Sequence, residues 1–238
     1  MKDNFRTHAQ NLALAKKVRE MLKHSFGVQM TKEEAILKGP VPKTMFLESV
    51  DKLADENVFR GGNIVFIAPD EIVPDLRKQL HTSGIMNDVF GVREAKGLEF
   101  DSVAVVDFFS YFEAKDNKQE WKDWLSSPTR DFNYILDHPE LEDQAMMLYT
   151  AITRARNNLY FIDFRCKANG TKGSPLAEFA YRELYKMKLV KIVSSIDEGS
   201  REMTPAEHKM RGILFITQAI DMYRNNEPIE NVEKKFAE

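Results

Sequence analysis

The sequence predicts an α/β domain built on a parallel sheet. Two short apolar runs, Asn63 to Ala68 and Ser102 to Val106, lack the polar alternation of a strand with one face in water. Such runs are typical of strands that are covered on both faces, as in parallel sheets. An amphipathic helical segment follows the first run, so strands and helices alternate along the chain, as α/β folds require.

Sequence patterns in the first half of the chain predict its helices and strands. Residues 5 to 24 repeat apolar side chains at three- and four-residue spacing, which predicts an amphipathic helix with a basic outer face. The capping-box pattern at residues 31 to 34 predicts a short helix that ends at Gly39-Pro40. Three strands are predicted in this half, at Thr44 to Leu47, at Asn63 to Ala68 and at about Asp88 to Val92. A second long helix is predicted from Asp70 to about Leu80.

The second half is more helical. Residues 110 to 147 are aromatic and charged, and they predict helices with a break at Ser127-Pro128. A helix from about Leu141 to Ala155 leads into a strand at Asn158 to Asp163. Ser174-Pro175 predicts another helix start, since Pro is favoured at the first helical position.

Two domains follow from this order of elements. We expect residues 1 to 165 to form the α/β domain and residues 166 to 238 to form a helical extension. Within the extension, residues 204 to 238 predict a helical hairpin that faintly resembles a tetratricopeptide unit. A single unit of this kind cannot bury its face alone, so it is expected to dock on the α/β domain or to begin a repeat array.

Composition excludes several classes of protein. The 34 Lys and Arg against 37 Asp and Glu give a net charge of -3, so nucleic-acid binding has to come from a local patch. The single cysteine excludes an internal disulfide, and the five histidines show no ligand spacing, so no metal site is assigned. No apolar stretch approaches the roughly 20 residues that span a bilayer. We therefore expect no membrane partner and an intracellular protein, cytoplasmic or nuclear.

Three separated segments place charged residues beside predicted buried strands. They are Asn4 to His8, Ala95 to Phe100 and Tyr149 to Arg156. Ligands of α/β folds bind at strand ends among the connecting loops, although a solvated loop is the alternative for the second segment. Arg154 and Arg156 end a helix that runs into a strand, and Arg presents a charged fork that suits phosphate oxygens. Taken alone, Arg154 also suits a surface salt bridge, and Arg156 suits a structural role at the helix end.

These segments resemble motifs of a known family. AKGLEFDSVAVVDFF resembles motif V, and LYTAITRARNNLYFID resembles motif VI, of the superfamily 1 helicases related to UvrD, Rep and PcrA. DNFRTHAQNLALAKKVREML is similar to their motif IV. The VREAKGLEFD form of motif V suits a closer relation to the eukaryotic helicase-like proteins that carry tetratricopeptide and ankyrin repeats. The resemblance covers residues 3 to about 165 and implies a RecA-like fold of the P-loop NTPase type.

The resemblance also implies an incomplete ATP site. The sequence contains no G-x-x-x-x-G-K-[ST] phosphate loop, and no Asp-Glu pair ends a buried strand. By resemblance this chain is therefore the second RecA-like domain, and its partner is the first RecA-like domain of the same parent protein. ATP with Mg²⁺ is expected only in the complete parent, so the chain alone should neither bind a cofactor tightly nor hydrolyse ATP.

Site residues follow from the resemblance position by position. Arg154 would be the arginine finger that stabilises charge on the transferring phosphoryl group, worth about 10³ to 10⁵ in turnover. Arg6 would reach the γ-phosphate from motif IV. Glu99 would accept a hydrogen bond from a ribose hydroxyl, although it could also cap the turn before the strand. Gly97 would allow a close backbone approach.

The expected nucleic-acid contacts depart from the family pattern. The family opens motif V with Thr-x-His, and its His contacts single-stranded DNA, whereas this chain has Gly91 and Arg93 at those positions. Arg93 and Lys96 can still contact phosphates, so single-stranded nucleic acid, first of all DNA, is the expected partner. Aromatic residues could stack bases, although packing of a helical insertion is favoured for them: Trp121, Trp124, Phe132 and Tyr134.

Two classes of function remain open. The first is the C-terminal motor domain of an ATP-dependent DNA helicase, an ATP hydrolase in its complete form. The second is a helicase-derived module without enzymatic activity that binds proteins through residues 166 to 238. Arg6, Glu99 and Arg154 favour the motor, whereas Gly91 and Arg93 favour the module. A domain that supplies its arginine to a separate ATPase chain is a third hypothesis.

Overall fold

The computed structural model describes eight stretches of the chain, residues 3–4, 8–28, 34–35, 39–60, 64–115, 117–126, 139–164 and 173–194. Arg6, Phe132, Tyr134 and both helices expected after residue 204 lie outside these stretches. The chain divides into two compact units, Met1–Ser200 and Arg201–Glu238. All of the described residues belong to the first unit.

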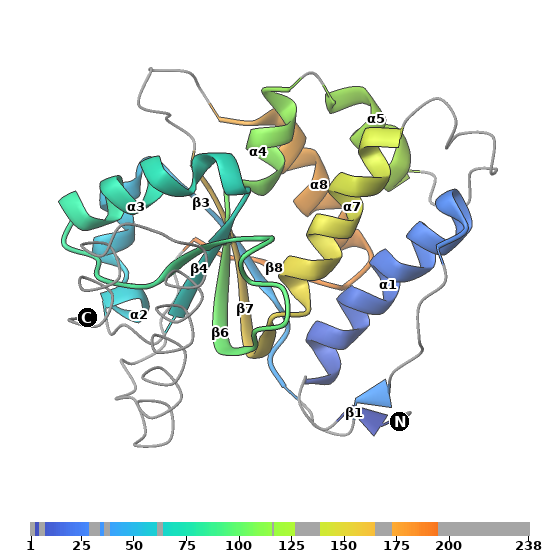
Figure 1. Cartoon of the computed structure of the whole chain (residues 1–238), viewed down its shortest axis with the longest axis horizontal. Helices are drawn as coiled ribbons and strands as arrows, with labels where there is room; N and C mark the ends of the chain where they lie inside the picture. Colours follow the sequence, from blue (N-terminus) through green and yellow to red (C-terminus); the bar gives the residue numbers. More distant parts are fainter. Residues whose placement is uncertain are drawn as a thin grey trace, which may run out of the picture. The chain divides into compact units, whose positions relative to one another are not determined.

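A six-stranded parallel sheet forms the centre of this unit (Figure 1). Its strand order is β5-β4-β6-β7-β3-β8, and every pairing is parallel. The strands are β3 (Lys43–Leu47), β4 (Ile64–Ala68), β5 (Val89–Gly91), β6 (Phe100–Val106), β7 (Ala155–Phe164) and β8 (Lys191–Ile192). The sheet confirms the predicted α/β class, with a parallel sheet flanked by helices.

Helices cover both faces of the sheet (Figure 1). One face carries α1 (Ala9–Phe26), α4 (Phe108–Glu113), α5 (Lys118–Ser126), α7 (Pro139–Ile152) and α8 (Pro175–Lys186). The other face carries the short helices η1 (Val50–Asp55), α2 (Asn57–Arg60) and η2 (Asp70–Ile72), together with α3 (Val73–Thr82). Strands between two helical layers need apolar side chains on both sides, which explains the unbroken apolar runs.

The central strand β6 shows this two-sided burial directly. Ala104 and Val106 pack in the core beneath α2 and α3, while Val103 and Val105 are equally buried on the opposite face. Because successive side chains of a strand point to opposite faces, this run has no solvent-facing position.

The aromatic side chains of α5 belong to the core. Trp121 and Trp124 are both fully buried. The indole nitrogen of Trp121 donates to Gln144 Oε1 at 2.6 Å, and that of Trp124 donates to Ser25 Oγ at 3.1 Å. Packing is therefore confirmed as their role in place of base stacking, because a fully buried ring cannot meet a base.

The predicted boundary at residue 165 differs from the structure. Helix α8 begins at Pro175. Its N-cap is Ser174, whose hydroxyl accepts a hydrogen bond from Ala177 N, and this confirms the predicted helix start. The helix packs against α4 and α5, and β8 then pairs with β3 at the edge of the sheet. The α/β unit thus extends beyond residue 190, because its sheet and helical layer need these elements.

Two local predictions are also wrong. Glu34–Ala35 forms strand β2 and pairs with β1 (Asp3–Asn4), so the capping-box pattern does not begin a helix there. Tertiary strand pairing outweighs local helix propensity at this point. Helix α7 ends at Ile152, and Arg156 already lies in β7, because the pairing of β7 with β6 extends back to Ala155.

Candidate nucleotide and nucleic-acid site

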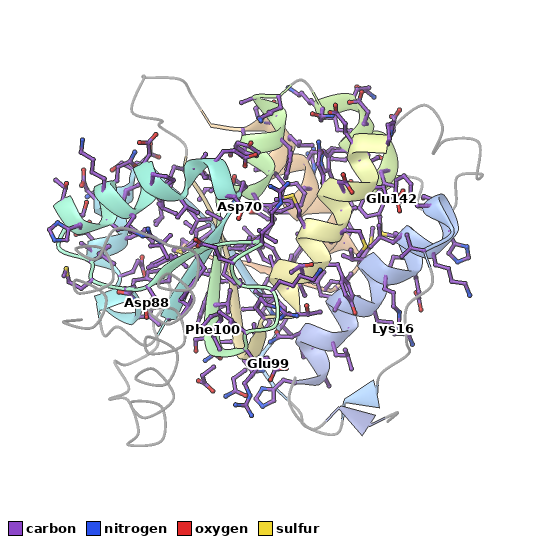
Figure 2. All side chains as sticks on the ribbon, in the orientation of Figure 1. Lys16, Asp70, Asp88, Glu99, Phe100 and Glu142 are labelled. Atoms are coloured by element: carbon purple, nitrogen blue, oxygen red, sulfur yellow. The ribbon has the colours of Figure 1, made fainter. Side chains whose placement is uncertain are left out.

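The segment between β5 and β6 carries most of the predicted site residues. It starts at the carboxyl end of β5, after Gly91, and returns to the amino end of β6 at Phe100. Arg93 therefore lies beside the carboxyl ends of the parallel strands, while Glu99 lies beside their amino ends. Figure 2 shows Asp70, the neighbour of Arg93, and Glu99 at opposite ends of the sheet. The predicted residues thus form two groups.

Arg154 is the centre of the group at the amino ends of the strands. It lies in the turn between α7 and β7 and is partly buried. Its Nη1 donates to Leu98 O at 2.9 Å and to Ala95 O at 3.4 Å. Its Nε donates to Thr150 O at 3.1 Å, and its Nη2 donates to Thr153 Oγ1 at 3.0 Å. The guanidinium therefore links the turn of motif V to the end of the motif VI helix.

The charge on Arg154 is held in a partly desolvated place. Burial lowers its pKa from the ordinary value, while the nearby Glu99 and Tyr149 act in the opposite direction. Since an arginine stays protonated in proteins, the lowered pKa records the unfavourable burial of a permanent positive charge. Its carbonyl partners offset that burial through hydrogen bonds to a charged donor.

The turn that Arg154 holds is exposed and tight. Leu98 N donates to Ala95 O at 3.0 Å, and Lys96 N donates to Arg93 O at 3.2 Å. Gly97 has φ of 89°, a conformation that side chains with a Cβ rarely adopt. Apart from Gly97 and its two chain neighbours, no atom of the described residues lies within 4 Å of the place where a Cβ on Gly97 would be. The glycine is therefore needed for backbone conformation, and the space beside it is open to a ligand.

Two charged side chains flank this turn in solvent. Lys96 and Glu99 are both exposed, on either side of Gly97. Phe100 N donates to Arg154 O at 2.9 Å, which fixes the backbone directly after Glu99. The structure thus brings together Gly97, Glu99 and Arg154, the described residues that are predicted to bind nucleotide. Lys96, which is predicted to contact nucleic acid together with Arg93, lies beside them.

Arg93 belongs to a separate group around Asp70. The Arg93 amide donates to Asp70 Oδ1 at 3.2 Å, and its Nε lies 3.8 Å from Asp70 Oδ2. The Arg93 side chain remains 79% exposed, so it can still reach a ligand. A Cβ on Gly91 would collide with the Asp70 carboxylate, and this collision explains the glycine at a position where the family has Thr. Sequence reasoning missed Asp70 because it gives no signal beyond its place after β4.

Sequence reasoning also missed a buried polar cluster at the carboxyl ends of β6 and β7. Asp163 is 1% exposed and accepts hydrogen bonds from the Ser110 and Tyr181 hydroxyls and from Ser110 N. Burial, with the nearby Asp107 carboxylate, raises the pKa of Asp163 to about 7. Asp107 has φ of 49° and accepts from Phe164 N at 2.9 Å. The available signal was an acidic residue near the end of each of two buried strands.

A groove of about 810 Å³ opens at the same carboxyl ends of the strands. Its charged lining comprises Asp51, Asp75 and Asp107 against one cation, Lys78. An acidic lining repels phosphate, so this groove suits a nucleotide less well than the turn at the amino ends of the strands does.

Within the described stretches, no cluster of three or more His, Cys, Asp or Glu residues could hold a metal ion. In the same stretches, no helix combines the length and the apolar character that crossing a membrane requires. Arg6 lies outside the described residues, so its predicted contact with phosphate stays a prediction.

Comparisons with known proteins agree with the motif resemblance. The chain is 25% identical over 253 residues to human TPR and ankyrin repeat-containing protein 1, and the match covers 88% of this chain. It spans 8% of that protein's length. This match confirms the predicted resemblance to proteins with these repeats. No protein-family model matches the chain.

Similar domains also occur among solved structures. The C-terminal domain of a possible DNA helicase from Lactobacillus plantarum WCFS1 is 19% identical, with a TM-score of 0.44. The superposition covers 79% of this chain and 98% of that domain.

Proposed function

We propose that this chain is the second RecA-like domain of a UvrD/Rep-like, ATP-dependent helicase. In this role it completes an ATP site whose phosphate loop and Mg²⁺ ligands lie on a first RecA-like domain. The observation that carries the proposal is the joining of two motifs by Arg154, whose guanidinium binds the carbonyls of Ala95 and Leu98. The cation of Arg154, the open turn at Gly97 and the exposed carboxylate of Glu99 then lie together at the amino ends of the strands.

Each group has a role suited to its chemistry. The backbone at Gly97 allows a nucleotide to approach closely, because no described residue beyond its two chain neighbours fills the space where a Cβ would lie. Glu99 accepts a hydrogen bond from a ribose hydroxyl. Arginine at this edge, from Arg154 and from Arg6 of motif IV, supplies positive charge to the phosphates.

Nucleic-acid binding is the second part of the proposal. Arg93 and Lys96 are exposed cations on the segment between β5 and β6. They contact phosphates of a single strand and therefore bind without reading its sequence.

The experiment uses the longest natural protein that contains this sequence. ATP hydrolysis is measured with and without single-stranded DNA, for ATP and for its 2′,3′-dideoxy analogue. We expect DNA-stimulated hydrolysis and a preference for ATP that Glu99→Ala removes, since Glu99 recognises the ribose. Glu178→Ala, an exposed carboxylate on α8, is the matched control and should keep the preference.

A second candidate is a helicase-derived module that binds proteins and lacks enzymatic activity. The Asp70 carboxylate favours this alternative, because it places negative charge beside Arg93 where the family contacts DNA. A full-length protein that neither binds nor hydrolyses ATP would contradict the motor proposal and leave the module in its place.

A further inference from the structure

We infer that Asn11 is a positioning residue of the proposed ATP site. Its side chain holds the first turn of α1, the helix of motif IV, against the start of β7, the strand of motif VI. It thereby sets the position of Arg6 relative to Arg154. This inference rests on the proposed function.

Hydrogen bonds join the start of α1 to the start of β7. Asn11 Nδ2 donates to Asn157 O at 3.1 Å and, at 3.5 Å, to Ala155 O. Between these two carbonyls, Arg156 O accepts from His8 N at 2.9 Å. Three successive carbonyls of β7 therefore accept hydrogen bonds from the start of α1.

The sheet is irregular at the point that α1 holds. Phe100 of β6 pairs with Ala155, but Ser102 pairs with Asn158, so β7 uses one more residue than β6 over this interval. Such a bulge takes a residue out of the regular pairing and bends the strand. The hydrogen bonds from α1 fix the bent strand directly after Arg154.

Burial makes Asn11 an unusual residue for the inner face of a helix. It shares this face with Leu14, Ala15 and Val18, and the spacing predicts an apolar side chain at its position. Asn11 is fully buried, and its Oδ1 has no hydrogen-bond partner within the described residues. A buried polar atom without a partner is unfavourable, and an apolar side chain of similar size would avoid that cost. The feature that distinguishes Asn11 is the contact of its amide group with β7.

This contact connects two of the arginines that are predicted to bind phosphate. Arg6 precedes His8 by two residues in the sequence, and His8 N is bound to β7. Arg154 directly precedes Ala155, and its guanidinium binds the motif V turn. A displacement of about 1 Å at a reacting group can cost about 10²-fold in rate. Asn11 therefore acts on the site through the arginines, without touching the nucleotide.

The test compares Asn11→Leu with Asn87→Leu in the longest natural protein that contains the sequence. Asn87 is a matched control, because it is also buried and its Nδ2 donates to a backbone carbonyl, Ile64 O, at 2.8 Å. Its Oδ1, like that of Asn11, has no hydrogen-bond partner among the described residues. Asn87, however, holds the segment before β5 to β4 and does not join α1 to β7.

We measure kcat and KM for ATP, the Kd of a fluorescent ATP analogue and the melting temperature. Both substitutions should lower the melting temperature by a similar amount, since each removes a buried hydrogen-bond donor. Asn11→Leu should also lower kcat by about 10²-fold and leave KM and Kd unchanged. Asn87→Leu should leave all three constants unchanged. If either leucine variant does not fold, Asn11→Ala and Asn87→Ala provide the same comparison.

A double-mutant cycle with Arg6→Ala tests how the effect reaches the site. If Asn11 positions Arg6, then Asn11→Leu should lower kcat far less in the Arg6→Ala background than in the wild type. Residues that act as a unit have non-additive effects, whereas independent residues give additive losses.

The outcomes separate the two proposals. An active protein in which Asn11→Leu keeps its kcat, or in which Asn87→Leu loses as much, would overturn this inference alone. Additive losses from Asn11→Leu and Arg6→Ala would also overturn it. A wild-type protein that neither binds nor hydrolyses ATP would instead remove the proposed function, and the role of Asn11 with it.

Discussion

The carboxylate of Asp70 occupies the space in which a side chain on Gly91 would begin. Asp70 follows β4, and Gly91 ends the neighbouring edge strand β5. The same carboxylate accepts a hydrogen bond from Arg93 N at 3.2 Å. One acidic side chain thus explains the glycine at 91 and fixes the backbone at 93.

Replacing Gly91 by Ala should destabilise the domain by about 1–3 kcal/mol, because the Asp70 side chain must move. Urea unfolding measures this loss. The control is the double variant Gly91→Ala with Asp70→Ala, which should recover part of the stability lost by Gly91→Ala. Additive effects of the two substitutions would show that the carboxylate and the glycine are not coupled.

Replacing Asp70 by Asn should strengthen binding of single-stranded DNA by about threefold at low salt. The substitution keeps the shape of the side chain and removes one negative charge beside the exposed Arg93, and such a charge contributes somewhat under 1 kcal/mol in water. Fluorescence anisotropy with a labelled oligonucleotide measures the affinity. Glu178→Gln on α8 is the control, and an equal gain there would indicate only a general effect of net charge.

Stability should fall as the pH rises from about 4 to about 7 because of Asp163. Its folded-state pKa of about 7 lies above the ordinary value of 3.8, so the folded state holds a proton that the unfolded state releases. The slope is about 1.4 kcal/mol per pH unit for one full proton. Thermal melts from pH 4.5 to 8 should show this slope in the wild type and a flatter profile in Asp163→Asn. Equal slopes would rule out Asp163 as its source.

Gly97→Ala should weaken nucleotide binding, whereas Gly84→Ala should not. Both glycines have positive φ, 89° and 75°, and both have open space where a Cβ would lie. Backbone strain of about 1–2 kcal/mol is therefore common to the two variants. Comparing the melting temperature and the Kd of a fluorescent ATP analogue in the full-length protein separates strain from contact. Equal Kd values for the two variants would exclude a nucleotide contact at Gly97.

Tryptophan fluorescence should not respond to single-stranded DNA. Trp121 and Trp124, the two tryptophans of the chain, are fully buried and hydrogen-bonded to Gln144 and Ser25. Their emission should be blue-shifted, and a saturating oligonucleotide should leave it unquenched. Quenching that Trp121→Phe abolishes would mean that this side chain reaches the nucleic acid.

The sequence predicts the fold where a local pattern and the tertiary structure agree. Strands β4 and β6 are identifiable because burial on both faces leaves an unbroken apolar run. Strand β8 has two residues and gives no pattern of its own, so the predicted end of the α/β unit, at residue 165, lies too early in the chain. Strand β2 has the same length, and it lies within a helix-like signal that pairing overrides.

For the site as well, the sequence predicts some features, while others depend on the tertiary structure. Motif spacing predicts that Arg154 lies near residues 95 to 99, and the hydrogen bonds to Ala95 and Leu98 place it there. The number of donors that Arg154 uses, and the lack of such bonds at Arg156 within the described residues, depend on backbone atoms brought together by folding. Residue type and spacing carry no information on these contacts.

The short strands at the two borders of the sheet have a consequence for solubility. Strand β5 has three residues and β8 has two, so each border offers few unpaired amides and carbonyls to another molecule. On the β5 side, Arg77 also donates to Val89 O at 2.7 Å. Short border strands, with this side-chain hydrogen bond on the β5 side, discourage edge-to-edge aggregation, to which an apolar sheet of this kind is otherwise prone.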